Sequence, residues 1–269
     1  MIQHLTAIWK FRHFLFALVR LDLRLRYKRS VLGIGWSLLN PLAMTAVFVV
    51  VFTQLLGASD PQNYTPFLLI GLAIWAFFRD SACTGCKSLI ANEAYIRQSP
   101  IPYGLYPLRT VLGNAIHSVI ALGVGVLVAI IAKSIPTPLT VFWGPLNVFW
   151  SIIPALLLAV IMGWALATIF AFVNVYFQDT QHLLDVAAQL LFFLTPITYK
   201  PEVLEKAGVG FMITLNPVNL YMDLIREPLL TGELPSLATY GTATAVTFAF
   251  VGLAFGTIAW LQKRVIFHL

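Results

Sequence analysis

The chain has 269 residues, of which 59% are hydrophobic and only 10% are charged, with a formal net charge of +6. Soluble domains carry roughly 25% charged residues, so this composition excludes a water-soluble globular domain. Several stretches of about 20 residues hold at most one ionisable group, which is the length of helix that crosses the hydrocarbon layer. We expect a single all-α integral membrane domain covering residues 1–269.

The N-terminal arm, residues 1–30, holds seven Lys and Arg side chains and lacks the apolar segment of a cleavable signal peptide. Its apolar residues recur at three- and four-residue spacing with basic residues along another face, which is typical of an amphipathic helix in the membrane interface. The stripe consists of Phe11, Phe14, Leu18, Leu21 and Leu25, while Phe16, Val19 and Leu23 fall outside it. The helix is interpreted either as a passive lipid anchor or as a gate at the cytoplasmic entrance.

Hydropathy predicts six membrane spans after the arm. They are expected at residues 34–57, 64–83, 108–131, 152–177, 183–199 and 237–261. The second and fifth spans are short, because Arg79 and Asp80 interrupt the one and Pro196 lies in the outer part of the other.

Thirteen of the 17 Lys and Arg residues lie on one side of the membrane if the N-terminus is cytoplasmic. This asymmetry follows the positive-inside rule, and an even number of spans places the C-terminus on the same side. Attraction to anionic membrane lipid accounts for these basic residues, so no nucleic-acid partner is expected.

Two connecting segments are predicted to be more than turns. In the outer segment, residues 200–235, Asn216-Pro217 precedes an amphipathic helix at about 218–230 that is too short and too polar to cross the membrane. We expect this helix to re-enter the outer leaflet, with a simple interfacial cap as the alternative. In the cytoplasmic loop, residues 84–102, a short polar helix would dock on a partner, and a solvated loop is the alternative.

Sequence motifs for nucleotide or metal binding are incomplete. Residues 85–88 resemble a phosphate-binding loop but lack both of the glycines that such a loop requires. Cys83 and Cys86 supply only two of the four ligands of a structural zinc site, so no metal site is expected. Any ATP must therefore be hydrolysed by another polypeptide.

Three ionisable residues cluster where the fourth and fifth spans meet the cytoplasm: Asp179, His182 and Asp185. Such a set could form a metal or acid-base site, and it is also typical of capping and subunit contacts. Ionisable residues are nearly absent from the predicted membrane interior, although an ion-coupled carrier keeps a few there. External energy input therefore fits better than a secondary transporter.

Aromatic residues make up 13% of the chain, more than two interfacial belts require. Some of them are expected to face a lumen, where flat rings and hydrogen-bonding edges suit sugar faces. The candidates are Trp36, Trp75, Phe78, Phe192, Phe193 and Tyr199.

Four ordered stretches resemble ABC-exporter permeases that move O-antigen or teichoic-acid polymers. They are residues 26–36 with Asn40-Pro41; residues 88–92 with Arg97 and Pro100; residues 178–182 with 192–197; and Asn216-Pro217 with Arg226 and Gly232. Gln178 departs from the pattern, because a basic residue is expected before Asp179, and this puts an arginine contact there in doubt.

This resemblance implies a homodimer of six-span subunits in the bacterial inner membrane, bound to two copies of a separate ATPase that holds ATP and Mg²⁺. The chain itself would carry no cofactor, and its substrate would be a lipid-linked polysaccharide. The resemblance also implies roles for three groups of residues. They are a gate helix with Phe14, Leu18, Leu21, Leu25, Arg26 and Tyr27; an ATPase-coupling segment with Leu89, Asn92, Glu93, Tyr95 and Arg97; and cytoplasmic contacts at Asp179 and His182.

The main alternative from another class is a polytopic membrane enzyme that acts on lipid-linked sugars. It rests on Asp179, His182 and Asp185 alone. Within the exporter class, a teichoic-acid or capsule polymer is an alternative substrate to O-antigen.

Overall fold

The computed structural model describes residues 9–28, 30–55, 61–131, 147–201, 203, 206 and 208–269. The first eight residues of the predicted arm and the end of the first predicted span lie outside these residues. Every regular element in the described part of the chain is helical. The α-helices are α2 (Arg12–Tyr27), α3 (Trp36–Val49), α4 (Pro61–Cys83), α5 (Glu93–Gln98), α6 (Leu105–Ile131), α8 (Asn147–Tyr176), α9 (Thr180–Leu194), α11 (Phe211–Leu215), α12 (Pro217–Leu230) and α13 (Leu237–Val265).

Four helices in the described residues are long and apolar enough to cross a membrane. They cover Pro61–Lys87, Leu105–Ile131, Trp150–Tyr176 and Leu237–Val265, close to four of the six predicted spans. The other two predicted spans correspond to shorter apolar helices, Leu38–Thr53 and Thr180–Leu194. The fifth predicted span was placed too far along the chain, because α9 ends at Leu194 and Thr195 is extended, which is the conformation favoured for a residue before proline.

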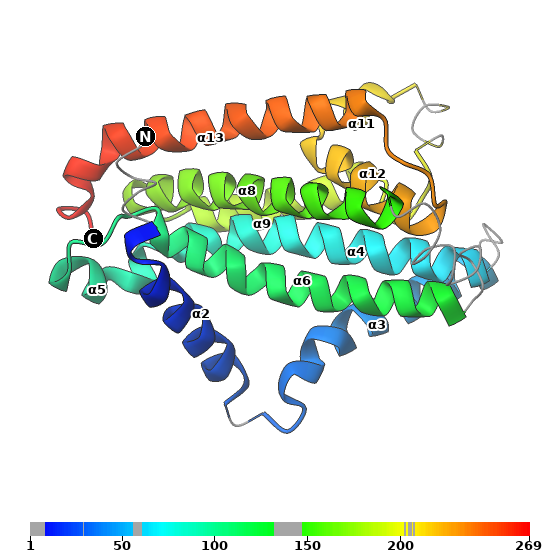
Figure 1. Ribbon diagram of the computed structural model, residues 1–269, viewed down its shortest axis with the longest axis horizontal. Helices are drawn as coiled ribbons and strands as arrows, with labels where there is room; N and C mark the ends of the chain where they lie inside the picture. Colours follow the sequence, from blue (N-terminus) through cyan, green and yellow to red (C-terminus); the bar gives the residue numbers. More distant parts are fainter. Residues whose placement is uncertain are drawn as a thin grey trace.

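Helix α4 is the centre of the bundle and contacts α3, α6, α8, α9 and α12. A helix that is apolar on most sides is either buried in protein or surrounded by lipid, and neighbours bury more than half of the apolar part of α4. Its fully or nearly fully buried residues are Leu68, Leu69, Ile70, Ala73, Ile74, Phe77 and Phe78. In contrast, α13 lies along α8 and turns large apolar side chains such as Trp260 outward (Figure 1).

Helices α2 and α3 form a V that stands away from the bundle beside α6 (Figure 1). The first half of α2 packs on α6 through Leu15, Leu18 and Val19, which contact Leu105. Within the predicted stripe Leu18 is buried, together with Val19 from outside it, while Leu21 and Leu25 are exposed. Helix α3 continues into a π-helix, Val50–Leu55.

The predicted helix of the outer segment is present as α12. Asn216 caps it, with the side-chain oxygen accepting a hydrogen bond from the Val218 amide at 3.0 Å, and Pro217 occupies the first helical position. Helix α12 packs on α4, α8 and α13, at the end of the bundle opposite α5 (Figure 1). Arg226 was expected on its polar face, but it is buried.

Gly85, in the 3₁₀ turn Gly85–Lys87, lies in close contact with α8. A Cβ at this position would lie 2.5 Å from the Ala167 Cβ and 3.0 Å from its Cα. Because neither neighbour can rotate away, we expect Gly85→Ala to lower the free energy of unfolding by about 1–3 kcal/mol. Thermal unfolding of the purified protein in detergent measures the effect.

The matched control is Gly123→Ala on α6, where nothing lies within 4 Å of the added Cβ. This substitution should leave the melting temperature unchanged or raise it, because Ala favours a helix by up to about 1 kcal/mol over Gly. Equal melting temperatures for the two variants would contradict the close packing of Gly85 on α8.

Candidate functional site

A crevice of about 830 Å³ lies between α3, α4 and α9. Its apolar wall is aromatic and includes Trp75, Phe192 and Phe193, with Met44 from α3. Towards the end of α4 the lining becomes polar and charged, with Asn40, Arg79, Asp80, Lys87, Asp185 and Gln189. The surface therefore offers rings along one part and hydrogen-bonding and ionic groups along the other.

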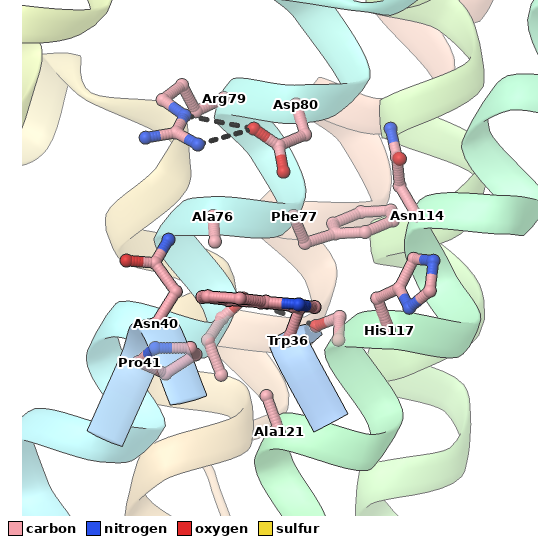
Figure 2. A pocket seen from close by; sticks show the side chains of 12 residues that line it. Trp36, Asn40, Pro41, Ala76, Phe77, Arg79, Asp80, Asn114, His117 and Ala121 are labelled. Carbon is pink, nitrogen blue, oxygen red and sulfur yellow. Dashed lines mark hydrogen bonds and ion pairs between the residues drawn. The ribbon is translucent and has the colours of Figure 1, made fainter. Parts of the chain in front are cut away.

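A second cavity, of about 370 Å³, lies on the other side of α3, between α3, α4 and α6. Figure 2 shows the Trp36 ring extending across it, between Asn40 on one side and His117 on the other. Asn40, Pro41, Ala76, Arg79 and Asp80 line both cavities. The first turns of α3 therefore divide one larger hollow in two.

Helix α4 lines the crevice with Trp75, Arg79 and Cys83, which recur every four residues and therefore share one helical face. Arg79 pairs with Asp80, with Nε 2.9 Å and Nη2 2.7 Å from the same carboxylate oxygen (Figure 2). Both side chains remain partly exposed, so the pair contributes little stability and is open to a ligand.

The structure brings four of the six candidate lumen aromatics to these cavities: Trp36, Trp75, Phe192 and Phe193. Phe192 lies edge-on to Trp75, with ring centroids 5.9 Å apart. Phe78 lies elsewhere, in the interior of the bundle, 4.9 Å from the Tyr221 ring. The Tyr199 hydroxyl donates to the Phe193 carbonyl at 2.6 Å and so holds the chain after α9 against its last turn.

The predicted coupling segment lies at the same end of the bundle as the start of α2 and the end of α13 (Figure 1). Leu89 and Asn92 face the interior and are buried. Glu93 and Arg97 lie on the surface and form an ion pair at 2.8 Å, and Tyr95 is exposed beside them. One face of the segment is therefore anchored in the bundle, and another is free of it.

Among the residues of the predicted gate helix, Phe14 is half-buried and contacts the Tyr95 ring edge-on, with centroids 6.5 Å apart. Leu18 is buried on α6, while Leu21 and Leu25 are exposed. The side chains of Arg26 and Tyr27 lie outside the described part of the structure.

Residues 13–230 match the model of the family described as "ABC-2 type transporter". The chain belongs to this family of transporter membrane subunits. It is 29% identical over 238 residues to an O-antigen export system permease protein RfbA of Klebsiella pneumoniae, covering 87% of this chain and 86% of that protein. The RfbA protein of Myxococcus xanthus is 25% identical over 257 residues, covering 93% and 94% of the two chains.

Another relative is the polysialic acid transport protein KpsM of Escherichia coli, which is 23% identical over 243 residues, 88% of this chain and 90% of that protein. The resemblance inferred from the sequence motifs is thus confirmed at the level of the family. Membership of a transporter permease family fits a chain that is not an enzyme by itself.

Asp179 and His182 of this ABC-2 family member are exposed at the start of α9, and Asp185 lies one turn further on, at the crevice. His182 contacts the neighbouring Gln181 side chain at 3.2 Å. Within the described residues, no group of three His, Cys, Asp or Glu is arranged to hold a metal ion. The two cysteines are free thiols, and the Cys86 Sγ donates to the Cys83 carbonyl at 3.0 Å.

Sequence reasoning missed two residues that join distant parts of the chain. Arg109 was counted only as a basic loop residue, yet it pairs with Asp22, 87 positions earlier. Asp22 is the one acidic residue in the basic arm, and this was the available signal. Arg226 was predicted to lie on the outer side of the membrane, off the apolar stripe of its helix, and no local pattern indicated its burial.

If the crevice is filled by water, cysteines placed at Asn40 and Gln189 should react quickly with a water-soluble maleimide. The thiolate is the reactive form, and it needs an aqueous surrounding. In a variant with Cys83 and Cys86 replaced by Ser, we expect labelling at least about tenfold faster at these sites than at Trp260→Cys on the outward face of α13. The rates are measured by mass shift in membranes.

The Trp260 position is the matched control because its side chain is 82% exposed but lies on an apolar helix face. Equal labelling rates at all three positions, or no labelling at Asn40 and Gln189, would contradict a hydrated crevice.

Proposed function

We propose that this chain is the channel subunit of an ATP-driven exporter that moves a lipid-linked polysaccharide from the cytoplasm across the bacterial inner membrane. The crevice between α3, α4 and α9 carries the proposal, because it combines an aromatic wall with hydrogen-bonding and charged groups. A sugar polymer presents apolar ring faces and hydroxyl edges, and such a surface suits both. The names of the relatives support a polysaccharide as the cargo, O-antigen or a capsule polymer.

The crevice is open along one side, so one subunit supplies only part of a channel. The two helices α3 and α9, which form walls of the crevice, carry exposed large apolar side chains, among them Leu39, Leu42, Leu190 and Phe193, which is 72% exposed. Exposed apolar faces of this kind mark interaction surfaces. A second copy of the chain, facing the first across these helices, would close the channel, and this supports a homodimer.

The proposed topology has six spans, with α3 and α9 as the two short ones and α12 as a helix that re-enters from the outer side. The start of α2, helix α5 and the end of α13 lie at one end of the bundle, and α12 lies towards the other (Figure 1). This arrangement supports two cytoplasmic termini. The basic residues Lys263 and Arg264 in the last turn of α13 agree with that side, since cytoplasmic ends of spans carry the excess of Lys and Arg.

Energy would enter through a separate ATPase, two copies of which would bind the cytoplasmic end and hold ATP and Mg²⁺. The exposed residues Glu93, Tyr95 and Arg97 form the surface that fits such a partner, because they stand outside the bundle while Leu89 anchors the segment within it. The chain would then need neither its own nucleotide site nor an ion-coupling residue.

Transport by the purified permease and its ATPase, reconstituted in vesicles with the ATPase outward, tests the function. ATP should move lipid-linked polysaccharide into the lumen, where it becomes protected from an added glycosidase. The variant Trp36→Ala with Phe193→Ala should slow this movement severalfold, because it removes two exposed rings near the crevice.

Trp260→Ala, which removes an exposed ring from the face of α13, is the matched control and should transport at the rate of the unaltered protein. Cells that lack the chain should make the polymer and retain it inside. Loss of polymer synthesis itself would favour the membrane enzyme instead.

Contact with the ATPase is expected at α5. Cysteines at Glu93 or Tyr95, in the variant without Cys83 and Cys86, should form cross-links to the co-expressed ATPase, because both side chains are exposed at the proposed cytoplasmic end. The products are identified by gel electrophoresis and mass spectrometry. Glu233→Cys, exposed near the opposite end, is the control and should give no cross-link; a cross-link there, or none from α5, would refute this docking surface.

A further inference from the structure

One guanidinium group joins three segments at the proposed cytoplasmic end. Arg109, near the start of α6, donates from Nε to Asp22 Oδ2 of α2 at 2.5 Å and from Nη2 to Asp22 Oδ1. Its Nη1 donates to Asn92 Oδ1 at 2.6 Å. Asn92 immediately precedes α5 and is itself held by a hydrogen bond from its Nδ2 to the Ser88 carbonyl at 2.7 Å.

This arrangement uses properties that only arginine has. The two bonds to Asp22 are parallel and bidentate, and the remaining nitrogen reaches a third group at a fixed angle. Lysine would keep the charge but could not hold both partners in this geometry. The Arg109 side chain is only 12% exposed, whereas that of Asp22 is 40% exposed, so the bridge lies at the edge of the bundle.

Asp22 stands where α2 leaves the bundle. Before it, Leu15, Leu18 and Val19 are buried on α6; after it, Leu25 is exposed. A cavity of about 400 Å³ lies beside the bridge, lined by Asp22, Leu25, Arg109 and residues of α6. The end of α2 therefore has room to move, and the ion pair is its last described polar tie to the bundle.

We propose that Arg109 is a positioning residue that transmits movement of the coupling segment to α2 through Asn92 and Asp22. This inference rests on the proposed function, in which the segment around α5 receives movement from an ATPase. The ring contact between Phe14 and Tyr95 is a second tie between the same two segments. Movement of α5 would pull on α2 at two places: near its start, through Phe14, and at Asp22, where it leaves the bundle.

The test uses the complete complex of this chain with its ATPase, carrying Arg109→Lys, Arg109→Gln or Asp22→Asn. Spin labels at Arg24, beyond Asp22 on α2, and at Gln98 on α5 are each paired with a label at Gly256 on α13, and distances are measured before and after trapping the ATPase with ATP and vanadate. Hydrolysis of ATP and export of polymer are measured on the unlabelled variants. Glu233→Gln, an exposed carboxylate at the other end of the bundle, is the matched control.

In the unaltered complex and in Glu233→Gln, both labels should shift on trapping. In the three bridge variants the α5 label should still shift while the α2 label does not, and export per ATP hydrolysed should fall about fivefold or more, the range of a typical coupling between sites. Arg109→Lys should behave like Arg109→Gln, because geometry and not charge forms the bridge.

An α2 label that shifts normally in Arg109→Gln would overturn the inference and leave the proposed function intact. If neither label shifts in the unaltered complex, the proposed coupling role of α5 is wrong and the inference falls with it. A bridge that only stabilised the fold would lower the melting temperature of Asp22→Asn without changing export per ATP, and this result would also overturn the inference.

Discussion

The end of the bundle that holds α12 is organised around the buried guanidinium of Arg226. Its Nη1 donates to the Pro196 carbonyl after α9 at 3.0 Å, and its Cζ lies 3.9 Å from the centre of the Phe67 ring on α4. None of the ion pairs in the described part of the chain includes it. A charged group inside an apolar bundle costs several kcal/mol unless polar and π contacts offset this, so these contacts fix where α12 and the end of α9 must lie.

The same interaction explains a small residue in the middle of the most buried helix. Gly71 of α4 lies directly under the guanidinium, and a Cβ there would overlap with Nη2. The crevice depends on this closeness, because α9 forms one of its walls and is tied to α12 through Pro196. Asn216 strengthens the tie, since its Nδ2 donates to Thr195 Oγ1 at 2.7 Å.

Hydropathy located the long helices within a few residues, since a run of apolar side chains without charges constrains both length and position. The start of α12 followed from a local cap, Asn216 with Pro217, which acts within one turn. What could not be predicted depends on partners far along the chain. The burial of Arg226 needs Phe67 and Pro196, and Val19 is buried because α6 approaches α2 from a direction that periodicity cannot specify.

The two ends of the molecule therefore differ in how firmly their helices are held. At the end with α12, a buried cation, a ring, a capping amide and a glycine contact interlock three helices, and moving any one of them would expose the charge. At the end with α5, the second half of α2 leaves the bundle. The ion pair between Asp22 and Arg109 ties it to α6 at the edge of the bundle, and Arg109 also binds Asn92. An ion pair at the edge can move together with its helices without exposing a buried charge, whereas displacing a buried charge is costly. A force applied at α5 would therefore move the second half of α2 before it disturbed α12.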